Sequence, residues 1–212
     1  MTEASFSPEE LRDRAIRVRK YITWFMIIAI VMFFAGLTSA YVVSMSGGYW
    51  VDIKMPQGFI VSTVAIILSS LTAHLALTAA QKGRTAAITP LLVLTLALGL
   101  VFTWSQFKGW KELTQKGNFL ISKVLDNKGV YGVDYTIRFQ GVPLVLENGH
   151  FFHPADAARI KPLNADLDEQ KNTASSYIFA ITGAHLAHLA FGLLALLVMI
   201  AMAWKNRYTP SD

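Results

Sequence analysis

The stretch SYIFAITGAHLAHLAFGLLALLVMIAMAW (176–204) decides the fold. Its nearest charged neighbours are Lys171 and Lys205, so it is longer than the ~20 apolar residues that a helix needs to cross the hydrocarbon core of a bilayer. A segment in lipid must satisfy its own backbone, and this one lacks the alternation of a barrel strand. It is therefore predicted to be a membrane-spanning helix.

Three further segments lack Asp, Glu, Lys and Arg, namely residues 21–51, 55–81 and 85–107. They predict spanning helices at about 21–46, 58–80 and 86–107. The first is much longer than the ~7–15-residue core of a signal peptide and follows a long, partly acidic leader, so we expect it to stay in the membrane. The predicted fold class is an all-α integral membrane protein with four transmembrane helices.

The distribution of basic residues orients the chain. They cluster before the first span, between the second and third, and after the fourth: Arg12, Arg14, Arg17, Arg19, Lys20, Lys82, Arg84, Lys205 and Arg207. By the positive-inside rule both termini are predicted to be cytoplasmic. The predicted parts are a cytoplasmic helix (1–20), three transmembrane helices (21–107), a periplasmic loop or insertion (108–175), a fourth transmembrane helix (176–204) and a cytoplasmic tail (205–212).

The N-terminal segment carries a helix-start signal. Ser7 is a candidate N-cap, Pro8 suits the first helical position, and Glu10 stands three residues after the cap. The predicted helix lies along the membrane interface or runs directly into the first span; a solvated lead-in is equally compatible with the sequence.

The outer segment 108–175 has nine Lys or Arg and eight Asp or Glu, so it carries no strong field. Within it, DYTIRFQGVPLVLENGHFF (134–152) alternates polar and apolar residues around glycine-containing turns, which predicts two or three short antiparallel strands. NADLDEQKN (164–172) is predicted to be a polar surface segment. We expect a small β element lying over the helices, since so few strands are marginal alone.

Composition excludes several functions. No carboxylate or basic side chain falls within a predicted span, which argues against ion pumps, ion-coupled carriers and voltage sensors. The chain contains no cysteine, so disulfides and thiolate metal sites are excluded. Its formal charge of +5 reflects membrane topology, and no basic stripe of the nucleic-acid-binding type is present.

Three histidines are the only ionisable residues within the predicted spans: His74, His185 and His188. His185 and His188 are three residues apart and share one helix face. A metal or haem site would need further ligands, which the spans do not supply as Cys or carboxylate, so a structural, hydrogen-bonding function is favoured. Outside the spans, His150, His153 and Asp156 have the spacing of a partial metal site, but surface histidines are the better interpretation.

Four motifs in order resemble subunit III of haem-copper oxidases of the cytochrome c oxidase type. They are MFFAGLTSAY (32–41), Pro56 leading into a span with Ser69 and Ser70, LGLVFTWSQFKGW (98–110) and TGAHLAHLAFG (182–192). The T-G-x-H-x-x-H pattern of the family falls on Thr182, Gly183, His185 and His188. Its M-F-F-A-G segment falls on Met32, Phe33, Phe34, Ala35 and Gly36.

The resemblance implies a non-catalytic subunit of an aerobic respiratory oxidase in the bacterial inner membrane. It implies packing on catalytic subunit I, with subunit II as a further partner and with haem and copper held by the partners. It also implies phospholipid binding, and support for proton uptake and for the stability of the catalytic subunit. The residues it marks as structural or lipid-contacting are Met32, Phe33, Phe34, Gly36, Thr182, Gly183, His185 and His188; it marks no catalytic, cofactor or metal residue in this chain.

Several positions depart from the family pattern. Ile30 stands where relatives often have a glutamate, and Leu77 and Thr78 stand where many have a His-His pair. The family has a further helix after the T-G-x-H-x-x-H span, so that helix is predicted to be lacking, supplied by another chain or missing from the sequence. Residues 133–175 resemble an insertion on the side where the electron donor docks, and are predicted to contact neighbouring subunits or a donor complex.

Three alternatives stay open. The chain is also compatible with an accessory subunit of a quinol oxidase or of a nitric oxide reductase. From a different class, it could be a small independent membrane transporter or a metal-dependent membrane enzyme that uses His74, His185 and His188. Co-purification with haem and copper subunits would separate these classes.

Overall fold

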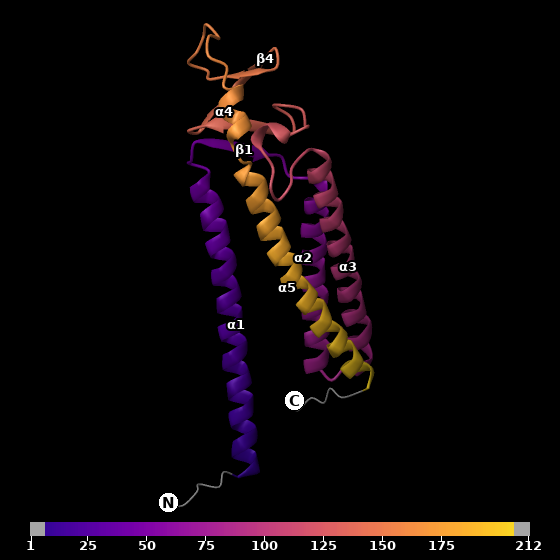
Figure 1. Cartoon of the computed structure of the whole chain (residues 1–212). Coiled ribbons are helices and arrows are strands. Elements are labelled where there is room, and N and C mark those ends of the chain that lie inside the picture. The colour runs from indigo at the N-terminus through magenta and orange to yellow at the C-terminus, as the bar shows by residue number, and fades with distance from the viewer. Residues whose placement is uncertain (1–6, 206–212) are drawn as a thin grey trace, which may run out of the picture. The chain divides into compact units, whose positions relative to one another are not determined.

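The computed structural model describes residues 7–205 (Figure 1). Four long helices lie within this range: α1 (Pro8–Ser44), α2 (Gln57–Gln81), α3 (Thr85–Gln115) and α5 (Thr173–Trp204). Each is long and apolar enough to cross a membrane, which confirms the predicted fold class. The chain forms two compact units, residues 1–44 and 45–212. Residues 1–6 of the predicted N-terminal helix and 206–212 of the predicted tail lie outside the described residues.

Helix α1 begins with the predicted capping box. The Ser7 amide donates to Glu10 Oε2 at 2.8 Å, and the Glu10 amide donates to Ser7 Oγ at 3.2 Å. These bonds satisfy backbone groups that the first helical turn leaves without an intrahelical partner. From Pro8 the helix is continuous to Ser44, so the N-terminal segment runs directly into the first span.

Helices α2 and α3 form an antiparallel hairpin with a small-residue seam. The buried positions of α2 recur every three or four residues and are Ser62, Ala65, Ser69, Thr72, Ala76 and Ala79. Small side chains let two membrane helices approach closely. A Cβ added at Gly58 would lie 2.8 Å from the Ser105 carbonyl oxygen, and one at Gly109 would lie 2.8 Å from the Phe59 ring. Glycine is therefore required by the nearby backbone at Gly58, and at Gly109 it makes room for the Phe59 ring.

Hydroxyl and amide side chains bond across the same seam. Thr72 Oγ1 and Thr95 Oγ1 are 2.8 Å apart, and Gln106 Nε2 donates to Ser62 Oγ at 2.9 Å. Such interhelical bonds in membrane proteins contribute about 0.6 kcal/mol each, and up to ~2 kcal/mol. They satisfy polar groups that would be costly in an apolar interior.

Helix α5 packs against this hairpin (Figure 1). At the end away from the strands, its side chains join an apolar cluster of Ala76, Ala79, Ile88, Leu92, Leu196 and Ala203. At the other end Asn172 caps the helix, because its Oδ1 accepts the Ser175 amide at 3.1 Å. The side chain of Asn172 also donates to Asn118 Oδ1 at 3.1 Å, which ties the start of α5 to the residues after α3.

The strands form a cap over the α2, α3 and α5 bundle (Figure 1). Strands β1 (Tyr49–Ile53), β2 (Tyr135–Phe139) and β3 (Val142–Pro143) make an antiparallel sheet in the order β1-β2-β3. Val51 lies opposite Ile137, and these side chains are 2% and 0% exposed. Strand β1 lies between the first two predicted spans, where the sequence analysis had assigned no strand, and its pairing with β2 ties the insertion to the chain between α1 and α2.

Two tight hairpins complete the strand region. Gln140 and Gly141 join β2 to β3, and Asn148 and Gly149 join β4 (Val145–Glu147) to β5 (His150–Phe152). All four turn residues have positive φ, between 49° and 84°, as two-residue type I′ turns require. The predicted β insertion is confirmed, but the predicted two or three strands are four in residues 134–152.

Two helical features lie outside the sequence prediction. Helix α3 continues to Gln115, beyond the predicted end at 107, and carries Lys108, Lys111 and Glu112 out of the uncharged region. The predicted polar segment 164–172 contains helix α4 (Asn164–Glu169), which packs on the short 3-10 helix η1 (Val124–Asp126). Leu167 of α4 is 0% exposed, so one apolar residue anchors an otherwise polar segment in the cap core.

Candidate functional site

The seam between α3 and α5 carries the strongest motif of the sequence. The indole Nε1 of Trp110 donates to Thr182 Oγ1 at 2.9 Å, and the same hydroxyl donates to the Ile178 carbonyl at 2.6 Å. The Trp110 ring also lies 6.0 Å from the Phe179 ring, centroid to centroid. Thr182 thus bonds to its own helix and to the neighbouring one, and fixes the lateral position of α5 on α3.

His185 continues the seam one turn further along α5. Its ring is half-buried and stands edge-on to the Phe102 ring of α3, with centroids 5.5 Å apart. His188 lies on the more exposed side of the helix. The predicted hydrogen bonds of the two imidazoles to other helices, partner subunits or headgroups stay a prediction.

The glycines of the motifs fall into two kinds. A Cβ at Gly99 of α3 would lie 2.7 Å from Leu193 Cδ2 of α5, so this glycine permits the α3–α5 contact. A Cβ at Gly183 would meet no atom within 4 Å. Packing inside the unit of residues 45–212 therefore does not account for a glycine at Gly183.

The first-span motif belongs to the unit of residues 1–44. Phe33 and Phe34 are in edge-to-face contact, with ring centroids 5.4 Å apart. Met32 and Phe33 expose more than half of their side-chain surface, and a Cβ at Gly36 would meet no atom within 4 Å. Within its own helix this motif is an apolar surface with a small residue in it.

The candidate metal ligands are not assembled into a centre. Among residues 7–205, no group of three or more His, Cys, Asp or Glu side chains is placed to hold a metal ion. His74 is exposed on α2. In the cap, His153 Nδ1 accepts the Ala155 amide at 3.2 Å, and the Asp156 carboxylate accepts the amides of Ile160 and Lys161. These cap side chains organise the turn that contains them.

An apolar groove opens at the end of the bundle away from the cap. Its volume is about 200 Å³, and it is lined by Ala73, Ala76, Leu77, Ala80, Ile88, Leu92, Leu196 and Met199. All three helices of the bundle contribute to it. Leu77 is part of this lining, and with the other aliphatic side chains it keeps the groove apolar.

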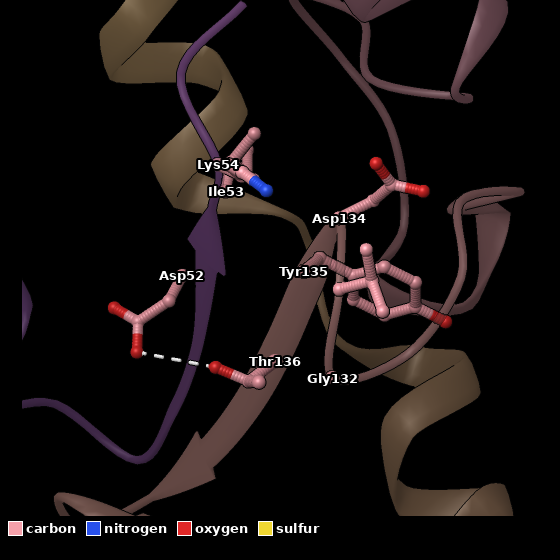
Figure 2. A pocket seen from close by; sticks show the side chains of 8 residues that line it. Asp52, Ile53, Lys54, Gly132, Asp134, Tyr135 and Thr136 are labelled. Carbon is pink, nitrogen blue, oxygen red and sulfur yellow. Dashed lines mark hydrogen bonds between the residues drawn. The ribbon is translucent and has the colours of Figure 1, made fainter.

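A polar hollow of about 290 Å³ lies at the base of the cap, where β1 and β2 meet the preceding loop (Figure 2). Lys116, at the end of α3, is 3.1 Å from Asp134 Oδ1 and 2.7 Å from Glu112 Oε1. The Val130 amide donates to Asp134 Oδ2 at 2.9 Å, and this bond, reinforced by Lys116, holds the pKa of Asp134 below its ordinary value of 3.8. The carboxylate is thus used to attach the cap to α3.

Asp52 on the other wall of the hollow is also engaged. It forms an ion pair with Arg138, and the Thr136 hydroxyl donates to it at 3.4 Å (Figure 2). The two carboxylates of the walls are therefore held in ion pairs with Lys116 and Arg138, and Lys54 adds a positive charge beside Asp134. This arrangement fits a structural base for the cap better than a ligand site.

Sequence reasoning did not assign the partners of the T-G-x-H-x-x-H motif. Trp110 and Phe102 contact Thr182 and His185, and both lie in the LGLVFTWSQFKGW segment that was quoted for the resemblance. The predicted topology places the end of one motif and the start of the other toward the same side of the membrane. One sequence does not show that the two helices are neighbours.

The fold and site together define a multi-pass helical membrane protein with a compact extramembrane cap and with its motif residues in helix seams. No protein-family model matches this chain. The chain is similar to cytochrome c oxidase subunit 3 of Corynebacterium diphtheriae, with 24% identity over 189 residues. The match covers 85% of this chain and 68% of that protein. It agrees with the resemblance found from the motifs.

Proposed function

We propose that this chain is the non-catalytic subunit III of an aerobic haem-copper terminal oxidase of the cytochrome c oxidase type. The observation that carries the proposal is the similarity to a cytochrome c oxidase subunit 3 along 85% of the chain, in a protein with four helices able to span a membrane. Under this proposal, haem and copper are held by partner subunits I and II. The chain itself contributes packing and lipid contacts.

The α3–α5 seam supports a structural function for the motif. Thr182 accepts a hydrogen bond from Trp110, and the His185 ring contacts the Phe102 ring, both on the neighbouring helix α3. Gly183 faces no close atom within its unit, so a small residue there suits close approach of a partner helix or a lipid chain. On this view the motif holds α5 straight on α3 and presents Gly183 and His188 to the rest of the complex.

The apolar groove supports phospholipid binding. Its lining is made of aliphatic side chains and Met199, and its volume of about 200 Å³ suits part of one acyl chain. Bound lipid would fill a gap between three helices that protein side chains leave open. We propose that this filling supports the durability and proton uptake of the catalytic subunit.

We also propose the orientation given by the basic residues, with both termini cytoplasmic in the bacterial inner membrane and the cap outside. The cap is then on the side of the electron donor, and residues 133–175 contact neighbouring subunits or a donor complex. Exposed residues at the cap surface, such as Leu146 and Val142, are suitable positions to test this contact. Replacing Val142 with Ser should weaken donor-dependent oxygen uptake without affecting assembly.

The function is tested by preparing oxidase membranes with and without this chain. Initial oxygen consumption should be retained without the chain, whereas activity should decay faster during sustained turnover and proton uptake should slow. Adding back the wild-type chain should restore both, and adding back the double variant His185→Leu, His188→Leu should restore them only in part. An oxidase that behaves identically with and without the chain would contradict the proposal.

A further inference from the structure

The loop after α3 presents three consecutive apolar side chains to the outside: Phe119, Leu120 and Ile121. Phe119 and Leu120 are about half exposed, and Ile121 is 82% exposed. Ser175 Oγ donates to the Phe119 carbonyl at 2.7 Å, and Ser176 Oγ donates to the Leu120 carbonyl at 2.7 Å. The loop is therefore fixed to the first turn of a membrane-spanning helix, with its side chains directed away from it.

The loop descends along α5 toward the membrane. Lys123 and Lys171 form an isolated antiparallel β-bridge, and the Asn172 amide donates to the Ser122 carbonyl at 2.8 Å. The carbonyls of residues 119 and 120 accept the hydroxyls of Ser175 and Ser176. The loop residues from Lys123 back to Leu120 therefore lie beside successive residues of α5, from the residue before the helix to its first turn. The tip of the loop is the part nearest the bilayer.

The level of the tip follows from the length of α5. As a helix, residues 176–204 extend about 42 Å, which is close to the ~40–45 Å thickness of a bilayer with its headgroups. The Leu120 carbonyl is bonded to Ser176, at the outer end of this stretch. The tip therefore lies at the outer edge of the headgroup layer.

The hydrogen bonding of the loop suits contact with lipid. Irregular backbone is excluded from lipid because its polar groups find no partner there. The Phe119 and Leu120 carbonyls, however, receive serine hydroxyls from α5. With these two carbonyls satisfied, the loop offers the bilayer three apolar side chains, and its other backbone groups can bond to lipid headgroups and water at the same level.

We propose that Phe119, Leu120 and Ile121 form an interfacial anchor that inserts into the headgroup layer of the cap-side leaflet. The anchor holds the junction of α3, α5 and the cap at a fixed depth. It does not depend on the proposed oxidase function, because it needs only the spanning helices and the loop. The partner it fits is the phospholipid bilayer itself.

The absence of cysteine from the chain permits a direct test. Ile121→Cys and the matched control Ile160→Cys place one thiol each at isoleucines that are 82% and 79% exposed, and Ile160 belongs to the connection between β5 and α4. Each variant of the full chain, with any subunits that accompany it, is labelled with an environment-sensitive fluorophore. It is then reconstituted in phosphatidylcholine–phosphatidylglycerol vesicles with or without headgroup-nitroxide lipid.

The label at residue 121 should be quenched more strongly by the nitroxide lipid and more weakly by aqueous iodide than the label at residue 160. Equal iodide quenching at both sites would place the loop in water and overturn the proposal. Resistance of residue 121 to both quenchers would overturn it as well, because a protein partner would then cover the loop. Leu120→Cys, labelled in the same way, keeps the test valid if Ile121→Cys fails to fold.

Discussion

The indole of Trp110 donates its N–H to the hydroxyl of Thr182 across 2.9 Å and joins α3 to α5. The two residues are 72 positions apart in the chain and belong to two different sequence motifs. Their bond gives the T-G-x-H-x-x-H motif a definite mechanical function in the described unit. It holds the last spanning helix to the hairpin of α2 and α3 at the end where the cap begins.

Removing the acceptor should loosen this seam. Thr182→Val leaves the Trp110 N–H without its partner in a partly buried site, so the free energy of unfolding should fall by about 0.5–2 kcal/mol. Thr182→Ser keeps the hydroxyl and should behave nearly as the wild type. Denaturant unfolding of the purified protein in detergent micelles measures both. Equal stability of the Val and wild-type proteins would show that the bond adds nothing.

Helix approach at Gly58 should not tolerate a methyl group. A Cβ there lies 2.8 Å from a backbone oxygen of α3, which cannot rotate away, so Gly58→Ala should destabilise the hairpin by about 1–3 kcal/mol. Gly192→Ala is the matched control, because a Cβ at Gly192 meets no atom within 4 Å. Thermal unfolding in micelles compares the two. If both variants melt together, the close approach of α2 and α3 is wrong.

The cap should detach from the bundle of α2, α3 and α5 when the buried apolar contact between β1 and β2 is removed. Ile137 is 0% exposed and lies opposite Val51, so Ile137→Ala should cost about 2–5 kcal/mol. We expect proteolytic cleavage within residues 134–162 to become faster, with the spanning helices left intact. Val142→Ala, at a position that is 40% exposed, serves as the control and should be cleaved at the wild-type rate. Unchanged cleavage of Ile137→Ala would contradict the strand pairing.

Acid should weaken the attachment of the cap to α3. The pKa of Asp134 is lowered in the folded protein, chiefly by the Val130 amide and then by Lys116. A lowered pKa contributes stability that is complete above the ordinary value of 3.8 and is lost as pH falls through the folded value below it. The protection factors of the 128–135 amides, in which the intrinsic pH dependence of exchange is divided out, should therefore fall below about pH 3.8 in the wild type.

The matched variant for this effect is Asp134→Asn, which has no carboxylate to titrate. Its exchange in the same segment should already be faster at neutral pH, because an amide is a weaker acceptor for the Val130 N–H and for Lys116. The protection factors of this segment should change less between neutral and acid pH in Asp134→Asn than in the wild type. A wild-type segment with no acid response would mean that another contact holds the cap.

The spanning helices were predictable because their signal is local. Runs without charge are longer than a bilayer needs, and the capping box at Ser7 and Glu10 lies within one turn, so sequence alone located them. The type I′ hairpin at Asn148 and Gly149 is equally local. The limits of the helices were less accurate, since α3 continues past Lys108 into a charged segment where hydropathy no longer marks it.

The contacts between distant segments were not predictable from one sequence. Strand β1 pairs with a strand more than eighty residues later, and nothing in YWVDI (49–53) names Ile137 as its partner. Its aromatic and β-branched residues were nevertheless a strand signal within the short first loop. Leu167 was missed for a related reason, because a single apolar residue in a polar segment gives no periodicity.

The central claim is that this chain works as an accessory subunit of a haem-copper oxidase. The most direct measurement is affinity purification of the tagged chain in mild detergent, followed by the reduced-minus-oxidised spectrum and copper content of the material. We predict a stable complex that contains haem and copper, in which separation of this chain leaves both with the other subunits. A solitary chain that is active alone, or that keeps haem or copper after separation, would contradict the account.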